Sequence, residues 1–181
     1  FVLEPMGRDT AAALALAALA LAARDPEAVG IVLPSDHMIP DAEAFAAAAV
    51  QAAAAAKAGH LAAFGLAPRH PATAYGYIKA GAPLGGGAFR IEAFVEKPDG
   101  PTAQAYVAVG EYSWNAGMFV VKAATLMQMI EDYQPRLAEY LRIIAANPFR
   151  LAELWPRLTK IAIDNAIAEP AAVDGRVATV P

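Results

Sequence analysis

Two alanine-rich segments, each followed by a short apolar run, constrain the fold of this chain more than any other feature. The first, residues 9–24, precedes the β-branched run Val29–Leu33. The second, residues 41–59, precedes Leu61–Leu66. Both runs are continuously apolar rather than alternating, which is typical of strands buried on both faces. This rhythm predicts an α/β fold, with a mostly parallel sheet and helices on both of its faces.

Helix-start and helix-stop residues bound the two alanine-rich segments. Asp9 or Thr10 can cap the first helix, Asp41 can cap the second, and Gly59 can end it. The first helix contains the apolar run Ala11–Ala23, which is shorter than the roughly 20 residues of a membrane span. Charged residues bracket this run closely. We therefore expect a buried helix there, and neither a membrane span nor a signal peptide.

The second half of the chain has shorter elements separated by glycine and proline. We expect strands at 75–79 and 89–96, separated by the turn Gly85–Gly87, and further strands at 112–121 and 176–180. We expect a helix at 101–109, a helical stretch at 123–147 that is interrupted near Gln134, and short helical turns at 151–158 and 165–169. Because the chain starts at Phe1 and ends in a strand, we expect residues 1–181 to be one incomplete domain that continues beyond both ends.

Charge and cysteine content exclude several classes of protein. The chain has 14 Lys and Arg against 18 Asp and Glu, a net charge of −4, and no basic stripe, so nucleic acid is not an expected partner. It has no cysteine, which excludes a disulfide scaffold and a cysteine zinc site. The absence of cysteine also suits a reducing cytoplasm.

Carboxylates stand at several element boundaries. Asp36 follows the first expected strand, and Glu96 ends the strand at 89–96, so both fall at carboxyl ends of strands, where α/β sheets bind ligands. Asp36 can be a Mg²⁺ ligand, because Mg²⁺ takes one or two carboxylates plus phosphate oxygens, or an ordinary turn residue. Asp164 precedes a short helical run, where a helix N-cap is the alternative to a metal ligand.

The residue types in the runs Phe94–Pro98 and Trp114–Phe119 point most clearly to a ligand-binding site. Glu96 can accept hydrogen bonds from vicinal hydroxyls while the adjacent Lys97 places a point charge on a phosphate. The alternative is a solvated ion pair of little energetic weight. Asn115, beside a glycine, can donate to and accept from a sugar hydroxyl, or can belong to a bulge on an edge strand. Together these residues suggest a site for a small, hydroxylated anion.

Two further segments contribute to this interpretation. Gly76, between Tyr75 and Tyr77, permits close approach of a ring to the backbone, although an aromatic strand is the alternative. Residues 4–10 lead into a helix N-terminus, where backbone N–H groups favour anions or polar ring edges. The alternative there is a capped helix start with an exposed Arg8.

The order of these motifs resembles the mannose-1-phosphate guanylyltransferases, which belong to the sugar nucleotidyltransferases. The motifs are Glu4–Ala11, Pro34–His37, Tyr75–Ile78, Phe94–Pro98, Trp114–Phe119 and Ile163–Ala166. The resemblance extends from Glu4 to about Glu169 and implies a Rossmann-like nucleotidyltransferase fold whose N-terminal part is missing here. It also implies a cytoplasmic enzyme that transfers GMP from GTP to mannose 1-phosphate, with Mg²⁺, giving GDP-mannose and pyrophosphate.

The resemblance implies roles for individual residues. Asp36 and Asp164 look like the metal-binding carboxylates, Lys97 like the contact to the sugar phosphate, and Glu96 like the contact to sugar hydroxyls. The residues implied around the sugar are Gly76, Asn115 and Gly117. The residues implied near the guanine base are Glu4, Arg8 and Asp9. The sugar phosphate is already an anionic nucleophile, so no general base and no covalent intermediate are expected.

The chain departs from the family pattern in places. At five positions the family usually has a different residue: Asn in place of Asp9, Gly in place of Ala74, Ser in place of Ala116, Tyr in place of Asn165 and Lys in place of Pro170. The family's Gly-rich, basic loop for the triphosphate has no counterpart before Glu4, so we expect these 181 residues alone to be inactive or nearly so.

Two alternatives to this function stay open at the level of sequence. One is a nucleotidyltransferase for another hexose 1-phosphate or another nucleotide. The other is a non-catalytic module that binds a sugar phosphate or a nucleotide. The implied partners are GTP and mannose 1-phosphate, with no membrane, and a homo-oligomer is left open.

Overall fold

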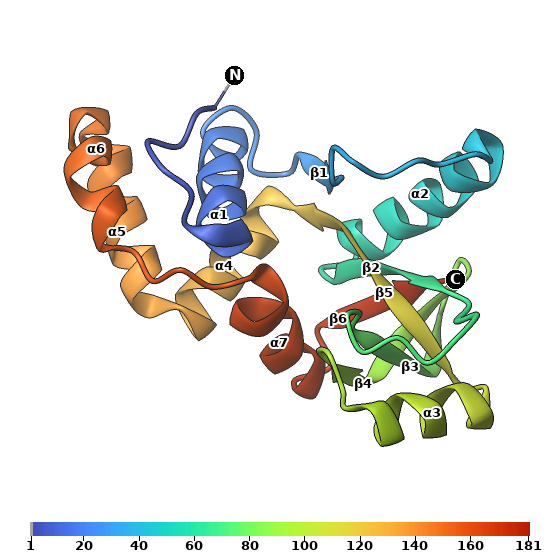
Figure 1. Cartoon of the computed structure of the whole chain (residues 1–181). Helices are drawn as coiled ribbons and strands as arrows, with labels where there is room; N and C mark the ends of the chain where they lie inside the picture. Colours follow the sequence, from blue (N-terminus) through green and yellow to red (C-terminus); the bar gives the residue numbers. More distant parts are fainter. Residues whose placement is uncertain (1) are drawn as a thin grey trace.

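The computed structural model describes residues 2–181 and shows a six-stranded sheet flanked by helices (Figure 1). The strands are β1 (Val29–Val32), β2 (Leu61–Leu66), β3 (Tyr77–Gly85), β4 (Ala88–Val95), β5 (Tyr112–Lys122) and β6 (Val177–Val180). The α-helices are α1 (Asp9–Ala22), α2 (Ala42–Lys57), α3 (Gly100–Val109), α4 (Ala123–Tyr133), α5 (Pro135–Ala146), α6 (Leu151–Leu154) and α7 (Glu169–Val173). Two 3₁₀ turns, η1 (Pro148–Arg150) and η2 (Trp155–Arg157), flank α6, and a π-helical turn, η3 (Asp164–Ala168), precedes α7. The predicted break near Gln134 separates α4 from α5 and is confirmed.

The strand order β1-β5-β2-β6-β4-β3 confirms the α/β prediction but corrects the prediction of a mostly parallel sheet. Among the described residues, only β2 and β6 pair in parallel, and the other neighbours are antiparallel. The reason is that β5 inserts antiparallel between β1 and β2, and that β3 and β4 form a hairpin around the predicted glycine turn. β1 consequently lies at an end of the sheet, where Ile31 is 46% exposed, so the prediction of a fully buried strand at Val29–Leu33 is also wrong.

Strand β5 changes partners along its length, and this produces an irregularity in the middle of the sheet. Its first residues pair with β3, and its last residues pair with β1. Against β2, Asn115 is opposite Gly65 and Phe119 is opposite Ala63, so β5 advances four residues where β2 advances two. The predicted bulge is therefore present, although β5 is an interior strand rather than an edge strand. Within this irregular stretch Gly117 has φ +66°, a conformation that glycine adopts readily.

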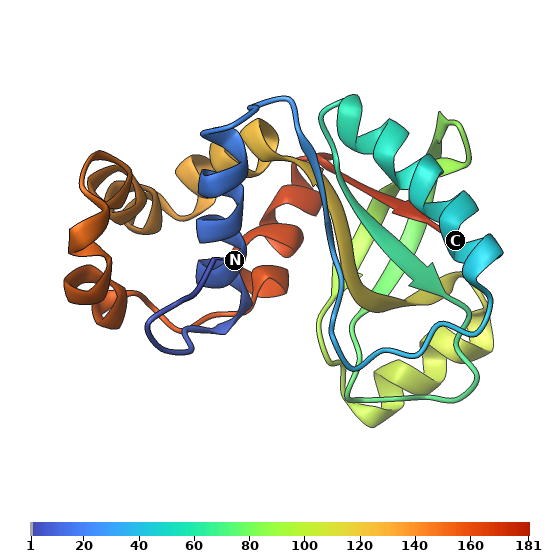
Figure 2. The same ribbon diagram turned by 90° about the horizontal axis from the view of Figure 1, so that it is seen from above.

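Two layers of apolar side chains cover the faces of the sheet. On β5, Phe119 and Val121 pack into a cluster with α1, α4 and α7, while Met118 and Val120 pack with α2 on the other side. Figure 2 shows α2 on one side of the sheet and α1 and α7 on the other. Helices on both faces are therefore confirmed, and α1 buries one face, with Ala11, Ala12, Ala15, Leu16 and Ala18 covered, while Ala17 and Leu21 are exposed. No helix in the described part of the chain is long and apolar enough to cross a bilayer.

The helix starts differ from one another in how they are capped. The predicted cap of α2 is confirmed, because Asp41 Oδ1 accepts from the N–H of Ala44 at 2.9 Å. The predicted side-chain cap of α1 is wrong. Asp9 has φ +65° and accepts only from the N–H of its neighbour Thr10, whose own Oγ1 accepts from the N–H of Ile163 at 2.8 Å. The start of α1 is therefore fastened to the segment that leads into η3.

Candidate functional site

A cleft of about 380 Å³ lies where the chain leaves β4 and where β5 is irregular. The approach to β3 and the first residue of η3 complete its wall. The lining residues are His37, Leu66, Ala74, Tyr75, Gly76, Glu96, Lys97, Trp114, Asn115, Ala116, Gly117 and Asp164. The cleft therefore brings together six of the ten site residues predicted from the sequence.

Glu96 and Lys97 form an ion pair at this cleft. Lys97 Nζ lies 2.7 Å from Glu96 Oε1, and the side chain of Glu96 is 13% exposed against 61% for Lys97. The hydrogen bond to Glu96 and the charge of Glu96 raise the pKa of Lys97, with smaller contributions from the charges of Asp164 and Asp9. Lys97 also has φ +48°, an uncommon backbone conformation outside glycine that is enriched at ligand sites. The result is a charged ammonium open to a ligand beside a largely covered carboxylate.

Asp164 and Asn115 form the second polar pair of the cleft. Asn115 Nδ2 donates to Asp164 Oδ1 at 2.7 Å, and Asn115 Oδ1 accepts from the N–H of Gly117 at 3.1 Å. Burial raises the pKa of Asp164 and the charge of Glu96 raises it further, against the lowering effect of the hydrogen bond from Asn115. Asp164 makes no side-chain cap bond in η3, so its interpretation as a helix N-cap is wrong. Two neighbouring carboxylates in a partly desolvated position favour a cation between or beside them.

Gly76 allows the polar groups of the cleft to approach the backbone. A Cβ at this position would lie 2.5 Å from Glu96 Oε2, which is closer than real Cβ contacts. The carbonyl of Gly76 also accepts from the N–H of Asn115 at 2.8 Å. The sequence predicted close approach of a ligand ring to Gly76, and the structure shows that the carboxylate of Glu96 occupies this space.

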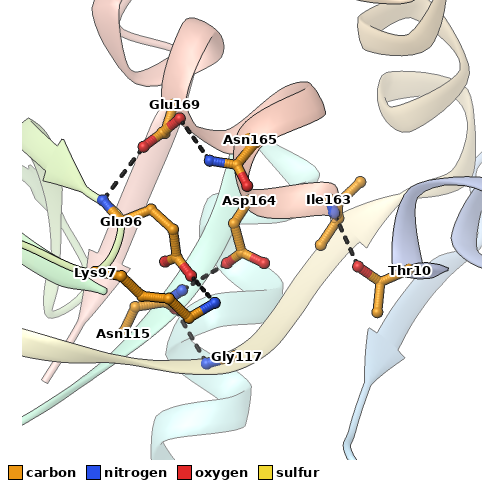
Figure 3. A network of polar contacts seen from close by, with 9 residues as sticks. All are labelled: Thr10, Glu96, Lys97, Asn115, Gly117, Ile163, Asp164, Asn165 and Glu169. Atoms are coloured by element: carbon orange, nitrogen blue, oxygen red, sulfur yellow. Dashed lines mark hydrogen bonds and ion pairs between the residues drawn. The ribbon is translucent and has the colours of Figure 1, made fainter. Parts of the chain in front are cut away.

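Glu169 is a polar neighbour of the site that the sequence analysis did not select. Its Oε1 accepts from the backbone N–H of Glu96 at 3.2 Å, and its Oε2 accepts from Asn165 Nδ2 at 3.0 Å (Figure 3). The spacing of four residues between Asn165 and Glu169 permits such a contact within a helix, but the contact to Glu96 spans 73 residues of sequence. No local pattern could have predicted that second contact.

Aromatic side chains form another part of the wall that was not assigned to the site. The ring of Trp114 meets His70 and Tyr75 edge-on, with ring centroids 4.9 Å and 5.2 Å apart. Trp114 and Tyr75 both line the cleft. Each lies next to a residue that was selected, so the motifs contained the signal, but the sequence analysis gave the rings themselves no role in the site.

The structure does not place the other four predicted residues in the lining of the cleft. Asp36 is exposed in a turn after β1, although the next residue, His37, lines the cleft. Glu4 is exposed, and the guanidinium of Arg8 donates to the carbonyl of Pro156. Asp9 reaches the site only through the effect of its charge on Lys97. Their roles stay predictions.

The carboxylates of the site bear on whether a magnesium ion fits there. Among residues 2–181, no three His, Cys, Asp or Glu side chains gather into a group that could hold a metal ion by itself. Mg²⁺ usually keeps several waters and takes one or two protein carboxylates together with phosphate oxygens. Asp164 in the cleft can supply one such carboxylate, whereas Asp36 is exposed outside the lining and its part in a metal site stays a prediction.

Comparison with known proteins gives one consistent result. The family model described as nucleotidyl transferase matches residues 1–154. The chain is 51% identical over 138 residues to the xanthan biosynthesis protein XanB of Xanthomonas campestris pv. campestris (strain B100), covering 76% of this chain and 29% of XanB. It is 46% identical over 144 residues to the mannose-1-phosphate guanylyltransferase of Escherichia coli (strain K12), covering 76% of this chain and 30% of that protein.

A solved structure is similar over nearly the whole chain. It is described as mannose-1-phosphate geranyltransferase from Thermus thermophilus, and it superposes with a TM-score of 0.88 at 39% identity, covering 98% of this chain and 51% of that chain. The present chain thus matches about half of that structure. It spans about three tenths of the length of the two curated relatives.

Proposed function

The chain belongs to the nucleotidyl transferase family, and on that premise we propose that it carries the sugar-phosphate half of a mannose-1-phosphate guanylyltransferase site. The overall reaction transfers GMP from GTP to mannose 1-phosphate and releases pyrophosphate. One observation carries the proposal: Glu96 and Lys97 present a carboxylate and an ammonium 2.7 Å apart at one cleft. A hexose 1-phosphate has the complementary arrangement, because ring hydroxyls lie next to a phosphate dianion.

Binding of the sugar phosphate would break the ion pair and give Glu96 and Lys97 each a new partner in the ligand. The side chain of Lys97 is 61% exposed, so it can turn from Glu96 towards an incoming phosphate. Glu96 is then free to accept hydrogen bonds from the sugar hydroxyls, which are donors. Asn115 and the backbone around Gly76 border the same space and supply further polar contacts. The ring of Trp114 offers an apolar surface beside them.

The chemistry requires positioning and charge neutralisation rather than proton transfer. An oxygen of mannose 1-phosphate forms a new bond to the α-phosphorus of GTP, and the bond from that phosphorus to the β-phosphate oxygen breaks, so pyrophosphate departs with the electron pair. The nucleophile is already anionic, and Lys97 would hold it in line while reducing its repulsion from GTP. Mg²⁺, held by Asp164 and Asp36, would neutralise charge on the α-phosphate and on the leaving pyrophosphate. Asn115 holds the carboxylate of Asp164 in place by its hydrogen bond.

The proposal includes a nucleotide-facing segment at the start of the chain. Glu4, Arg8 and Asp9 are proposed to face the base of GTP. A carboxylate suits guanine because the N1–H and N2–H₂ groups of its edge are adjacent donors. This assignment rests on the resemblance, since none of the three residues lines the cleft.

The test of this function has a binding arm and a turnover arm. Calorimetry on the 181-residue chain should show saturable binding of mannose 1-phosphate in preference to glucose 1-phosphate and mannose 6-phosphate. Pyrophosphate release, measured on the chain with any flanking sequence that its gene encodes, should require GTP, mannose 1-phosphate and Mg²⁺ together. Preference for another hexose 1-phosphate or nucleotide would reassign the substrate. Sugar-phosphate binding without any pyrophosphate release would indicate a non-catalytic binding module instead.

A further inference from the structure

Glu169 contacts both segments that supply charged groups to the cleft, although it does not line the cleft itself. One carboxylate oxygen accepts from the backbone N–H of Glu96, and the other accepts from the side chain of Asn165. Its own backbone N–H donates to the carbonyl of Asp164 across the π-helical turn η3. One residue is thus bonded to the strand end that presents Glu96 and Lys97 and to the turn that presents Asp164.

The contact to Glu96 lies where the sheet no longer supports the backbone. The ladder between β3 and β4 ends at the pair Tyr77–Val95, so the N–H of Glu96 is the first beyond it. The next residue, Lys97, has a left-handed backbone conformation. Glu169 supplies the acceptor that the ladder does not offer, and fixing this peptide fixes the direction in which the Glu96 side chain leaves the backbone. The position of Glu96 in turn determines where Lys97 is held, through the 2.7 Å ion pair.

The contacts on the other side stabilise an unusual turn. A π-helical turn contains one residue more than an α-helical turn, and such turns occur mostly as isolated features near functional sites. In η3, the backbone bond from Glu169 closes this turn, and the side-chain bond between Glu169 and Asn165 spans the same residues. Asp164 begins η3, so its carboxylate is placed by the geometry of the turn and by the hydrogen bond from Asn115.

We infer that Glu169 is a positioning residue that sets the distance between the Glu96–Lys97 pair and Asp164, and thereby tunes affinity for the sugar phosphate. This role rests on the proposed function for its ligand, but the coupling itself is a property of the ligand-free chain. The alternative is a purely structural role, in which the charge of Glu169 at the first position of α7 stabilises that helix through its interaction with the helix dipole. The two roles differ in what glutamine can replace: glutamine keeps an acceptor for the N–H of Glu96 but removes the charge.

The experiment compares Glu169→Ala, Glu169→Gln and a matched control, Glu131→Ala, which removes a surface glutamate paired with Arg142 at 3.2 Å. The first readout is hydrogen exchange of the Glu96 amide by NMR, which needs no ligand. We expect exchange to accelerate about tenfold or more in Glu169→Ala, because the bond that protects this amide is lost. Glu169→Gln should stay within about threefold of wild type, and Glu131→Ala should leave this amide unchanged.

The second readout is the dissociation constant for mannose 1-phosphate. Trp114 lines the cleft whereas Trp155 is fully buried, so fluorescence of Trp114 in a Trp155→Phe background can report binding, with calorimetry as an independent check. We expect about tenfold weaker binding in Glu169→Ala and substantial rescue in Glu169→Gln. A structural role at the helix start would instead lower Tm equally in both variants and leave affinity unchanged.

Each outcome decides one part of the inference. Unchanged Glu96 exchange together with unchanged affinity in Glu169→Ala overturns it. If the wild-type chain does not bind mannose 1-phosphate, the proposed function fails, while faster Glu96 exchange in Glu169→Ala still supports the coupling. If Glu169→Ala does not fold, Asn165→Ala decides, because Asn165 is exposed and its loss removes one contact only. Binding about threefold weaker at unchanged Tm supports the inference, and wild-type binding in that variant overturns it.

Discussion

Asp164 and Asp36 are proposed to hold the same cation, yet they lie in opposite surroundings. Asp164 is bonded to Asn115, lies near Glu96, and has its pKa raised by burial. Asp36 is exposed in the turn after β1, on a loop whose Met38 is 92% exposed. The carboxylate of Asp164 is fixed and partly desolvated, which costs folding stability, whereas the carboxylate of Asp36 is exposed to water. The difference indicates a site with one preorganised wall, fixed by hydrogen bonds, and one open wall, whose proposed ligand Asp36 is exposed.

The two walls also differ in how many elements support them. The preorganised wall joins the approach to β3, the end of β4, the irregular part of β5 and η3 through hydrogen bonds of Asn115 and Glu169. The open wall depends on the loop between β1 and α2, whose far end is capped by Asp41. Substitutions on the first wall should therefore change both function and stability, whereas substitutions on the second should change function alone.

The largest expected effect is that of Asp164→Asn. Turnover should fall about 10³-fold, because the variant loses a charge worth several kcal/mol in the transition state. Thermal stability should rise at pH 7, by about 2–4 °C in Tm for roughly 1 kcal/mol, because a desolvated charge beside Glu96 is removed while the amide can still accept from Asn115. Pyrophosphate release, measured on the chain with any flanking sequence that its gene encodes, and calorimetric unfolding measure the two effects. A lower Tm would contradict the account of this wall.

Asp36→Asn should show most clearly that the two carboxylates differ in their effect on stability. We expect turnover to fall about 10²-fold, which is less than for Asp164 because water can replace an exposed ligand. Stability should change by no more than about 0.5 kcal/mol, since the side chain is exposed. The same two measurements apply here. A marked change in Tm would contradict the account of the open wall.

Gly76→Ala should weaken the preorganised wall without changing any charge. The new Cβ would lie 2.5 Å from Glu96 Oε2, so the carboxylate must move and the Glu96–Lys97 pair must move with it. Affinity for mannose 1-phosphate should fall about tenfold, as expected for loss of one hydrogen bond to a charged group. Gly100→Ala is the matched control, because nothing lies within 4 Å of a Cβ at that glycine. Equal affinities of the two variants would show that Glu96 is not held where the structure places it.

The smallest expected effect is a dependence of stability on pH. The pKa of Asp164 is raised in the folded state, mainly by burial, so the folded chain binds this proton more tightly than the unfolded chain does. Stability should therefore fall as pH rises from the ordinary pKa of an aspartate to the raised value. The quantity to measure is the difference in unfolding free energy between wild type and Asp164→Asn across this interval, in which contributions of other groups cancel.

The residues of the preorganised wall differ in how far the sequence could predict them. Glu96, Lys97 and Asn115 belong to short motifs whose local chemistry points to a ligand, and the structure gathers them in one cleft. The contact of Glu169 with Glu96 spans 73 residues of sequence, so no local pattern contains it.

The strand order, like the contact of Glu169 with Glu96, could not be predicted from local sequence patterns. Helix and strand positions follow from apolar periodicity and from residues such as Asp41 and Gly59, and they were largely predicted. The insertion of β5 between β1 and β2 is decided by tertiary packing, so the helix–strand rhythm wrongly favoured a parallel sheet. That insertion also creates the irregular stretch from Asn115 to Gly117 in the wall of the cleft.

Calorimetric titration of mannose 1-phosphate into wild type, Lys97→Met and Lys79→Met tests the central claim most directly. Lys79 is the matched control, because it is also ion-paired, with Glu92 at 3.0 Å and Glu111 at 3.2 Å, but does not line the cleft. The account predicts saturable binding to wild type and Lys79→Met, and at least about tenfold weaker binding to Lys97→Met. Equal affinity of all three proteins, or of wild type for mannose 1-phosphate and inorganic phosphate, would contradict it.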